Sequence, residues 1–150
     1  MTNEHNVILL IEDNPDDEEL TSLAFEQSGI SNKLVVVRDG AEALDYLFAT
    51  GAWAGREGGN PSLVLLDLKL PKIGGLDVLR RLRADSSTRL IPVVILTSSV
   101  EELDIINGYD LGCNSYIRKP VDFSQFAAAV RNLGMYWLVL NEPPNTKGAA

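Results

Sequence analysis

Cysteine, histidine and basic residues are scarce in this sequence of 150 residues. The single cysteine, Cys113, excludes an internal disulfide and is typical of a protein from a reducing cytoplasm. His5 is the only histidine, so the usual ligands of a zinc site are missing. The 13 Lys and Arg residues against 21 Asp and Glu residues give a net charge of −8. This charge argues against general binding to nucleic acid or to anionic lipid.

Long hydrophobic runs are absent as well. No apolar run approaches the roughly 20 residues that a helix needs to cross a bilayer. The polar N-terminus, Met-Thr-Asn-Glu-His-Asn, lacks the pattern of a signal peptide. The sequence does have 45% hydrophobic residues, which is enough for the core of one domain. It therefore predicts an acidic, cytoplasmic, single-domain protein without a membrane or nucleic-acid partner.

Five short apolar runs alternate with longer amphipathic stretches. The runs cover residues 7–11, 33–37, 63–66, 93–96 and 115–117. Runs this short and apolar are typical of parallel strands buried on both faces. The helical patterns cover residues 15–29, 39–49, 76–84, 100–111 and about 122–140. The alternation predicts an α/β fold, a doubly wound parallel sheet of five strands with helices on both faces.

Two segments fall outside this rhythm. Residues 50–61 are rich in glycine and predict a surface loop. Residues 141–150 form a polar C-terminal tail. We therefore expect one domain over residues 1–140, with a core at about 6–133, and no output domain. Within the fourth helical pattern, three apolar residues share one side of the helix: Leu103, Ile106 and Tyr109.

Polar side chains follow four of the five apolar runs. They supply three carboxylates, one hydroxyl and one amine: Glu12, Asp13, Asp67, Thr97 and Lys119. The carboxyl ends of parallel strands lie along one edge of the sheet, where ligands bind. We therefore expect these side chains to meet in one cleft.

Three carboxylates in one cleft repel each other, because unit charges about 4 Å apart cost roughly 1–4 kcal/mol. A hard divalent cation relieves this repulsion, and the oxygen ligands favour magnesium. The alternative is that the acids only cap helices and turns. We favour capping for Asp16 and Asp17, and metal binding for Asp13 and Asp67.

Phosphoryl transfer is a reaction that suits this set of groups. An aspartate beside magnesium can attack a phosphoryl donor and become an acyl phosphate, which assigns this role to Asp67. Lys119 and Thr97 can then donate hydrogen bonds to the other phosphoryl oxygens. Pro120 makes the preceding bond tolerant of the cis form, and a cis-proline would turn Lys119 inward.

Four motifs occur here in the order and at the intervals of a known family. They are Ile11-Glu12-Asp13-Asn14, then Leu65-Leu66-Asp67-Leu68 with Pro71 and Gly74-Gly75, then Thr97-Ser98, and finally Tyr116-Ile117-Arg118-Lys119-Pro120. The chain thereby resembles the receiver domain of two-component response regulators over about residues 6–133. The resemblance implies a CheY-like, flavodoxin-like fold with strand order 2-1-3-4-5.

The resemblance also implies roles for single residues. Asp67 corresponds to the phosphoacceptor. Glu12, Asp13, Asp67 and the backbone carbonyl of Lys69 correspond to the ligands of Mg²⁺, for which Mn²⁺ can substitute. The hydroxyl of Thr97 and the ring of Tyr116 correspond to a switch pair that responds to phosphorylation. Such a protein is not an enzyme beyond its own phosphorylation and dephosphorylation.

Two further features of the sequence resemble one subgroup of response regulators. The loop at 50–61 and the stretch from Tyr136 to Pro144 resemble single-domain regulators that pair with bacterial and cyanobacterial phytochrome histidine kinases. This similarity implies a phytochrome-type sensor histidine kinase as partner. It also implies a homodimer, for which Tyr136, Trp137 and Leu138 are the interface candidates because they form part of an apolar run. The function expected is that of a stand-alone regulator.

Three other functions remain to be compared with this one. A phosphatase of the haloacid dehalogenase kind needs a second Asp two positions after the nucleophile, where this chain has Lys69. A flavodoxin-like cofactor module needs a phosphate-binding loop, but the acidic residues at 12–17 repel phosphate. The third function is a receiver that serves only for docking and is never phosphorylated.

Overall fold

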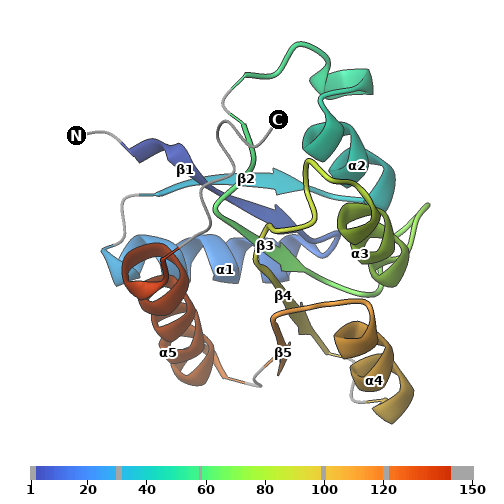
Figure 1. Cartoon of the computed structure of the whole chain (residues 1–150). Coiled ribbons are helices and arrows are strands. Elements are labelled where there is room, and N and C mark those ends of the chain that lie inside the picture. The colour runs from blue at the N-terminus through green and yellow to red at the C-terminus, as the bar shows by residue number, and fades with distance from the viewer. Residues whose placement is uncertain (1–2, 30–31, 58, 99–100, 120–121, 143–150) are drawn as a thin grey trace.

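Five strands form one parallel sheet in the computed structural model, which describes residues 3–29, 32–57, 59–98, 101–119 and 122–142. The strands lie in the order β2-β1-β3-β4-β5, as predicted. Their bounds are β1 (Asn3–Ile11), β2 (Asn32–Val37), β3 (Leu63–Leu66), β4 (Val93–Thr97) and β5 (Ser115–Arg118) (Figure 1). The predicted doubly wound fold is confirmed.

Helices cover both faces of this sheet. Helices α1 (Pro15–Ser28) and α5 (Phe123–Gly134) lie on one side, and α2 (Gly40–Phe48), α3 (Gly75–Ala84) and α4 (Glu102–Asp110) lie on the other (Figure 1). Side chains of a strand alternate between the faces, so each side of the sheet has its own core. Among the described residues, no helix is both long enough and apolar enough to cross a membrane.

The turn between β1 and α1 is fixed by local hydrogen bonds. The Asn14 side chain accepts from the backbone N–H groups of Asp16 at 2.9 Å and Asp17 at 3.2 Å, and Pro15 begins the helix. Gly29 ends the helix with φ 77°, in the left-handed region that glycine adopts readily. This capping holds the start of α1 against the edge where β1 ends.

Helix α4 differs from the other helices in where its apolar side points. Its only buried residue is Gly108. The three apolar residues that share one side are exposed, with exposed fractions of 65% for Leu103, 48% for Ile106 and 52% for Tyr109. This apolar side therefore faces solvent instead of the core.

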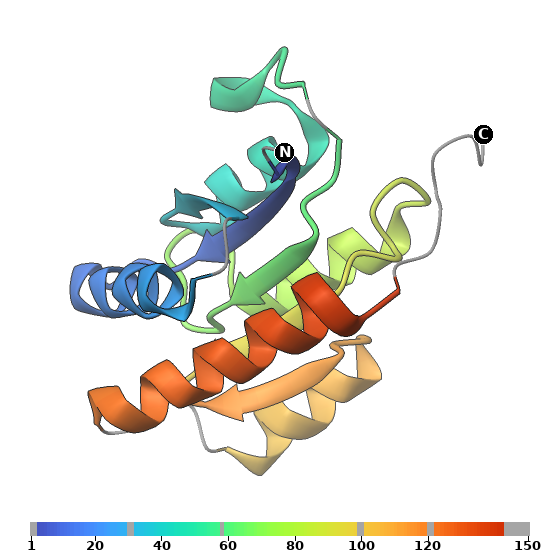
Figure 2. The same cartoon turned by 90° about the vertical axis from the view of Figure 1, so that its left-hand side faces the viewer.

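The chain after α5 continues as a helix of larger diameter, the π-helical segment η2 (Met135–Leu140) (Figure 2). Trp137 and Leu138 are half-buried against the core beneath α1 and α5, whereas Tyr136 is exposed. In the loop at 50–61, a short 3₁₀ turn η1 (Gly51–Trp53) places Trp53 against the ring of Tyr46, 4.8 Å between centroids.

Candidate functional site

The five predicted site residues do meet at the carboxyl edge of the sheet. Backbone hydrogen bonds hold the segments just beyond the strands in place. The N–H of Glu12 donates to the carbonyl of Val37 at 3.0 Å, and the N–H of Asp67 donates to that of Ile11 at 3.1 Å. The N–H of Lys119 donates to the carbonyl of Thr97 at 2.8 Å. The continued strand pairing therefore fixes where these side chains begin.

Three carboxylates form a compact cluster at this edge. Glu12, Asp13 and Asp67 each offer one oxygen, and these oxygens all lie within 4.8 Å of one another. Glu12 and Asp67 are buried, whereas Asp13 is exposed. An oxygen-only ligand set that is open to water on one side fits a hard divalent cation such as Mg²⁺.

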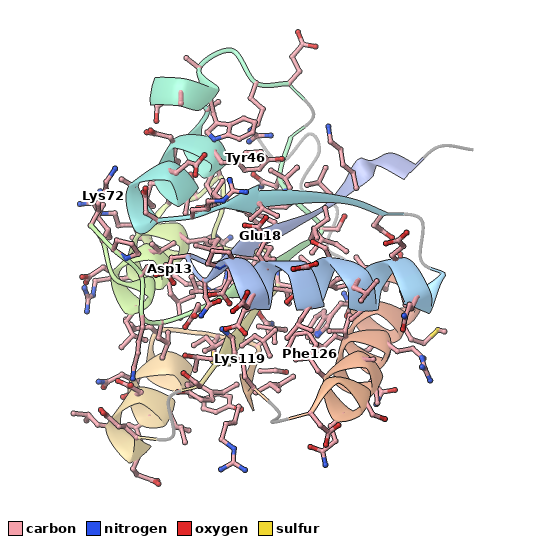
Figure 3. The ribbon with its side chains drawn as sticks, turned by 180° about the vertical axis from the view of Figure 1, so that it is seen from behind. Asp13, Glu18, Tyr46, Lys72, Lys119 and Phe126 are labelled. Carbon is pink, nitrogen blue, oxygen red and sulfur yellow. The ribbon has the colours of Figure 1, made fainter. Side chains whose placement is uncertain are left out.

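Lys119 joins this cluster from the end of β5. Its ammonium Nζ donates to Glu12 Oε1 at 2.5 Å, to Asp17 Oδ2 at 2.7 Å and to Asp67 Oδ2 at 3.1 Å. Burial lowers the pKa of Lys119, but the hydrogen bonds and charges of these carboxylates outweigh it and keep the pKa above its usual value. Figure 3 shows Lys119 and Asp13 near the end of α1 at which the helix begins.

Asp67 is held by donors on several sides. Thr97, which is fully buried, donates from Oγ1 to Asp67 Oδ1 at 2.8 Å. The backbone N–H of Lys69 donates to the same oxygen at 3.2 Å. Burial raises the pKa of Asp67, but hydrogen bonds from Glu12 and Thr97 and the charge of Lys119 outweigh it and lower the pKa.

Glu12 behaves in the opposite way. Burial raises its pKa to about 7 against the opposing effect of Lys119, and its hydrogen bond with Asp67 adds to the rise. Of the two neighbouring carboxylates, Glu12 therefore takes up a proton more readily than Asp67, whose lowered pKa favours the ionised form. An ionised carboxylate between an ammonium and a hydroxyl is a suitable nucleophile for an incoming phosphoryl group.

The remaining predicted residues have different surroundings. Tyr116 is half-buried on β5 and packs against the core on the α2 and α3 side. The metal-ligand role of the Lys69 carbonyl stays a prediction. Pro120, the cis-proline candidate, lies outside the described residues.

One site residue was missed by the sequence interpretation. Asp17 was interpreted as a helix-capping residue, but its carboxylate reaches Lys119. Asp16, the residue before it, is exposed, as capping residues commonly are. The available signal was the position of Asp17 in the first turn of a helix that begins at the edge of the sheet.

A comparison with protein families agrees with this geometry. The model of the response regulator receiver domain matches residues 8–131. This chain belongs to the response regulator receiver family. Receiver domains of this family are signalling modules.

Two relatives are similar over most of their length. The chain is 40% identical over 141 residues to FilR2 of Methanothrix harundinacea, a probable methanogenesis regulatory protein, covering 92% of this chain and 87% of FilR2. It is 35% identical over 137 residues to the response regulator Rcp1 of Synechocystis, covering 91% of this chain and 92% of Rcp1.

Solved structures of response regulators share the fold. Phosphorylated RcpA, a cyanobacterial phytochrome response regulator, superposes with a TM-score of 0.87 at 40% identity, covering 94% of this chain and 99% of RcpA. The Mn²⁺-bound form of Rcp1 superposes with a TM-score of 0.85 at 34% identity, covering 93% of this chain and 99% of Rcp1. The bacteriophytochrome response regulator RtBRR superposes with a TM-score of 0.76 at 54% identity, covering 97% of this chain and 87% of RtBRR.

Proposed function

We propose that this protein is a response regulator that accepts a phosphoryl group on Asp67 from a sensor histidine kinase, with Mg²⁺ as cofactor. The observation that carries the proposal is the placement of the ionised Asp67 carboxylate between the acidic cluster and the donors Thr97 and Lys119. Glu12, Asp13, Asp67 and the backbone carbonyl of Lys69 would hold the cation. When bound, the cation neutralises charge on the incoming phosphoryl group. The Mn²⁺-bound form of Rcp1 supports a divalent ion here.

The chain's own residues account for the transfer step. An oxygen of Asp67 attacks the phosphorus of the phosphohistidine, the phosphorus–nitrogen bond breaks, and the imidazole leaves with the electron pair. The Thr97 hydroxyl and the Lys119 ammonium already donate to Asp67, so small movements bring them to the new phosphoryl oxygens. Fixed donors of this kind stabilise charge without reorganisation during the reaction.

A signal can leave the site through β4, β5 and α4. Thr97 ends β4, and Ile95 of that strand pairs with Tyr116 on β5. A Cβ atom added at Gly108 of α4 would lie 3.4 Å from the Tyr116 ring, so the ring is next to this helix. We expect movement of Thr97 toward a phosphoryl group to turn Tyr116 inward and to change the surface of α4, β5 and α5.

The proposed partner is a phytochrome-type histidine kinase in the cytoplasm. The names of RcpA and RtBRR, which associate both proteins with phytochromes, support this pairing. The name of FilR2 refers instead to methanogenesis. Phosphotransfer profiling against all histidine kinases of the source organism decides between these associations, and preferential transfer from a kinase without a phytochrome module would contradict the proposal.

We also propose a homodimer that uses Tyr136, Trp137 and Leu138. Support comes from the exposed ring of Tyr136, which borders an open pocket together with Trp137 and residues of β5 and α5. Trp137 and Leu138 also pack on their own domain, so Tyr136 should carry most of the contact. Light scattering at micromolar concentration should give a dimeric mass, and Tyr136→Ser should lower it. A monomeric mass with and without phosphorylation would contradict the dimer.

The acceptor itself is tested by labelling with acetyl phosphate and Mg²⁺. Intact-mass spectrometry should show one added phosphoryl group in the native chain and none in Asp67→Asn. Asp110→Asn, at an exposed position on α4, is the matched control and should be labelled normally. Undiminished labelling of Asp67→Asn would move the acceptor elsewhere. Unlabelled native protein would favour the docking module instead.

A further inference from the structure

The ammonium of Lys119 has no free donor in this structure. It carries three N–H groups, and three carboxylates accept from it. Two of these acceptors, Glu12 and Asp67, also belong to the carboxylate cluster that fits a cation. The third, Asp17, comes from α1 and is not part of that cluster.

The backbone of Asp17 is fixed on both sides of the residue. Its N–H donates to the Asn14 side chain at 3.2 Å, and its carbonyl accepts from the Thr21 hydroxyl at 2.8 Å. Its side chain is 30% exposed, whereas that of Glu12 is 2% exposed. Asp17 is therefore the acceptor that water can most easily solvate when Lys119 leaves it.

A phosphoryl group on Asp67 adds oxygens that also need the Lys119 ammonium. The donor now on Asp67 can pass to a phosphoryl oxygen, but because the other two donors are in use, the ammonium can serve further phosphoryl oxygens only by releasing Glu12 or Asp17. The energetic cost of release is lowest at Asp17, which water can reach, and highest at the buried Glu12.

From this geometry we propose that Asp17 is a positioning residue that competes with the phosphoryl group for Lys119 and thereby limits how readily Asp67 is phosphorylated. The inference rests on the proposed phosphoacceptor role of Asp67. Replacing the Asp17 carboxylate by a neutral group of the same shape removes one negative charge beside the Lys119 ammonium. The ammonium then attracts an anionic phosphoryl donor more strongly. Removing a unit charge at hydrogen-bond distance from the ammonium should change the rate of phosphorylation by about tenfold.

The test compares the initial rate of phosphorylation by acetyl phosphate at saturating Mg²⁺, measured by intact-mass spectrometry. Asp17→Asn should be phosphorylated about tenfold faster than the native chain. Asp16→Asn removes the same charge from the neighbouring exposed position and should stay within about twofold. Asp17→Glu keeps the charge and should return to the native rate.

A second measurement does not depend on turnover. The dissociation constant for beryllofluoride, an anion that mimics the phosphoryl group, is measured by nuclear magnetic resonance titration with Mg²⁺. It should fall by about tenfold in Asp17→Asn and stay within about twofold in Asp16→Asn. A merely structural role of Asp17 would instead weaken beryllofluoride binding.

The outcomes separate this inference from the proposed function. If the native chain is labelled but Asp17→Asn is no faster than Asp16→Asn, or is slower than the native chain, the competition by Asp17 is wrong and the role of Asp67 stands. If neither the native chain nor Asp17→Asn is labelled or binds beryllofluoride, both proposals are wrong.

Discussion

Helices α3 and α4 cover the same face of the sheet but use their apolar residues differently. Helix α3 buries three of them completely or nearly so: Val78, Leu79 and Leu82. Helix α4 buries only Gly108 and exposes three large apolar side chains: Leu103, Ile106 and Tyr109. Apolar periodicity therefore marks the core contact of one helix and an exposed surface on the other, where an apolar patch is typical of a contact site.

The largest expected difference concerns the glycines of these helices. A Cβ atom at Gly75 of α3 would collide with the backbone carbonyl of Asp67 and lie 2.7 Å from the Cα of Leu68. Gly75→Ala should therefore lower the free energy of unfolding by at least about 3 kcal/mol and displace the backbone at Asp67. A Cβ atom at Gly108 of α4 meets only side-chain atoms, the nearest being the terminal Cδ1 of Ile95 at 2.9 Å.

Gly108→Ala should change the free energy of unfolding by less than about 1 kcal/mol, because Ala favours a helix over Gly by about that amount. Urea denaturation followed by circular dichroism measures both variants. Equal losses in the two helices would contradict the comparison.

Truncation of apolar side chains should give the next largest difference. Leu79→Ala in α3 leaves a cavity in the core and should cost about 2–5 kcal/mol of unfolding free energy. Leu103→Ala in α4 removes an exposed side chain and should stay within about 0.5 kcal/mol. Thermal and urea unfolding of the pair measure both values, and a loss above 2 kcal/mol for Leu103→Ala would mean that α4 packs into the core after all.

Glu12, at the carboxyl edge of the sheet, should make the free energy of unfolding depend on pH. The pKa of Glu12 rises from 4.5 to about 7 on folding because the side chain is buried. The folded state thus holds this proton more tightly than the unfolded state. The resulting stability is complete below pH 4.5 and is lost as the pH rises through about 7.

Without divalent metal, the free energy of unfolding should fall by about 1–3 kcal/mol over this pH range. Glu12→Gln should remove most of the slope, whereas Leu79→Ala should keep it at a lower overall stability. A slope that persists in Glu12→Gln would assign the titration to another group.

The smallest effect is expected where the two helices are linked. Arg83, in the last turn of α3, donates to the carbonyls of Gly112 at 2.8 Å and Ile91 at 2.7 Å, and to the Asn114 side chain at 3.0 Å. Arg83→Met should cost about 1–2 kcal/mol of unfolding free energy. Arg81→Met, at an exposed position of the same turn, is the control and should cost less than about 0.5 kcal/mol of unfolding free energy. Equal effects would show that Arg83 does not anchor the end of α4.

The strand-end residues could be predicted because their positions follow from chain topology. Short apolar runs alternate with helical patterns, so Asp13, Asp67 and Thr97 have to reach one edge of a parallel sheet. No long-range detail of packing is needed for that conclusion. The capping of α1 by Asn14 was also predictable, since it depends only on the neighbouring residues.

Other features depend on tertiary packing and could not be predicted. The apolar side of α4 has the same pattern as a core-facing helix, and only the neighbouring elements decide which way it points. The contact of Asp17 with Lys119 joins residues 102 positions apart in the sequence and depends on two side-chain conformations. The widening of the helix after Gly134 into η2 has no clear signal in the sequence.

The position of Lys119 among the carboxylates affects how a divalent ion could bind there. The ammonium already balances part of the negative charge between β1, β3 and β5, so the domain should be fully folded in a chelating buffer. A divalent ion would have to share Glu12 and Asp67 with this ammonium, so we expect weaker binding than at a carboxylate cluster without an internal cation. We therefore expect removal of the ion to prevent phosphorylation without unfolding the domain.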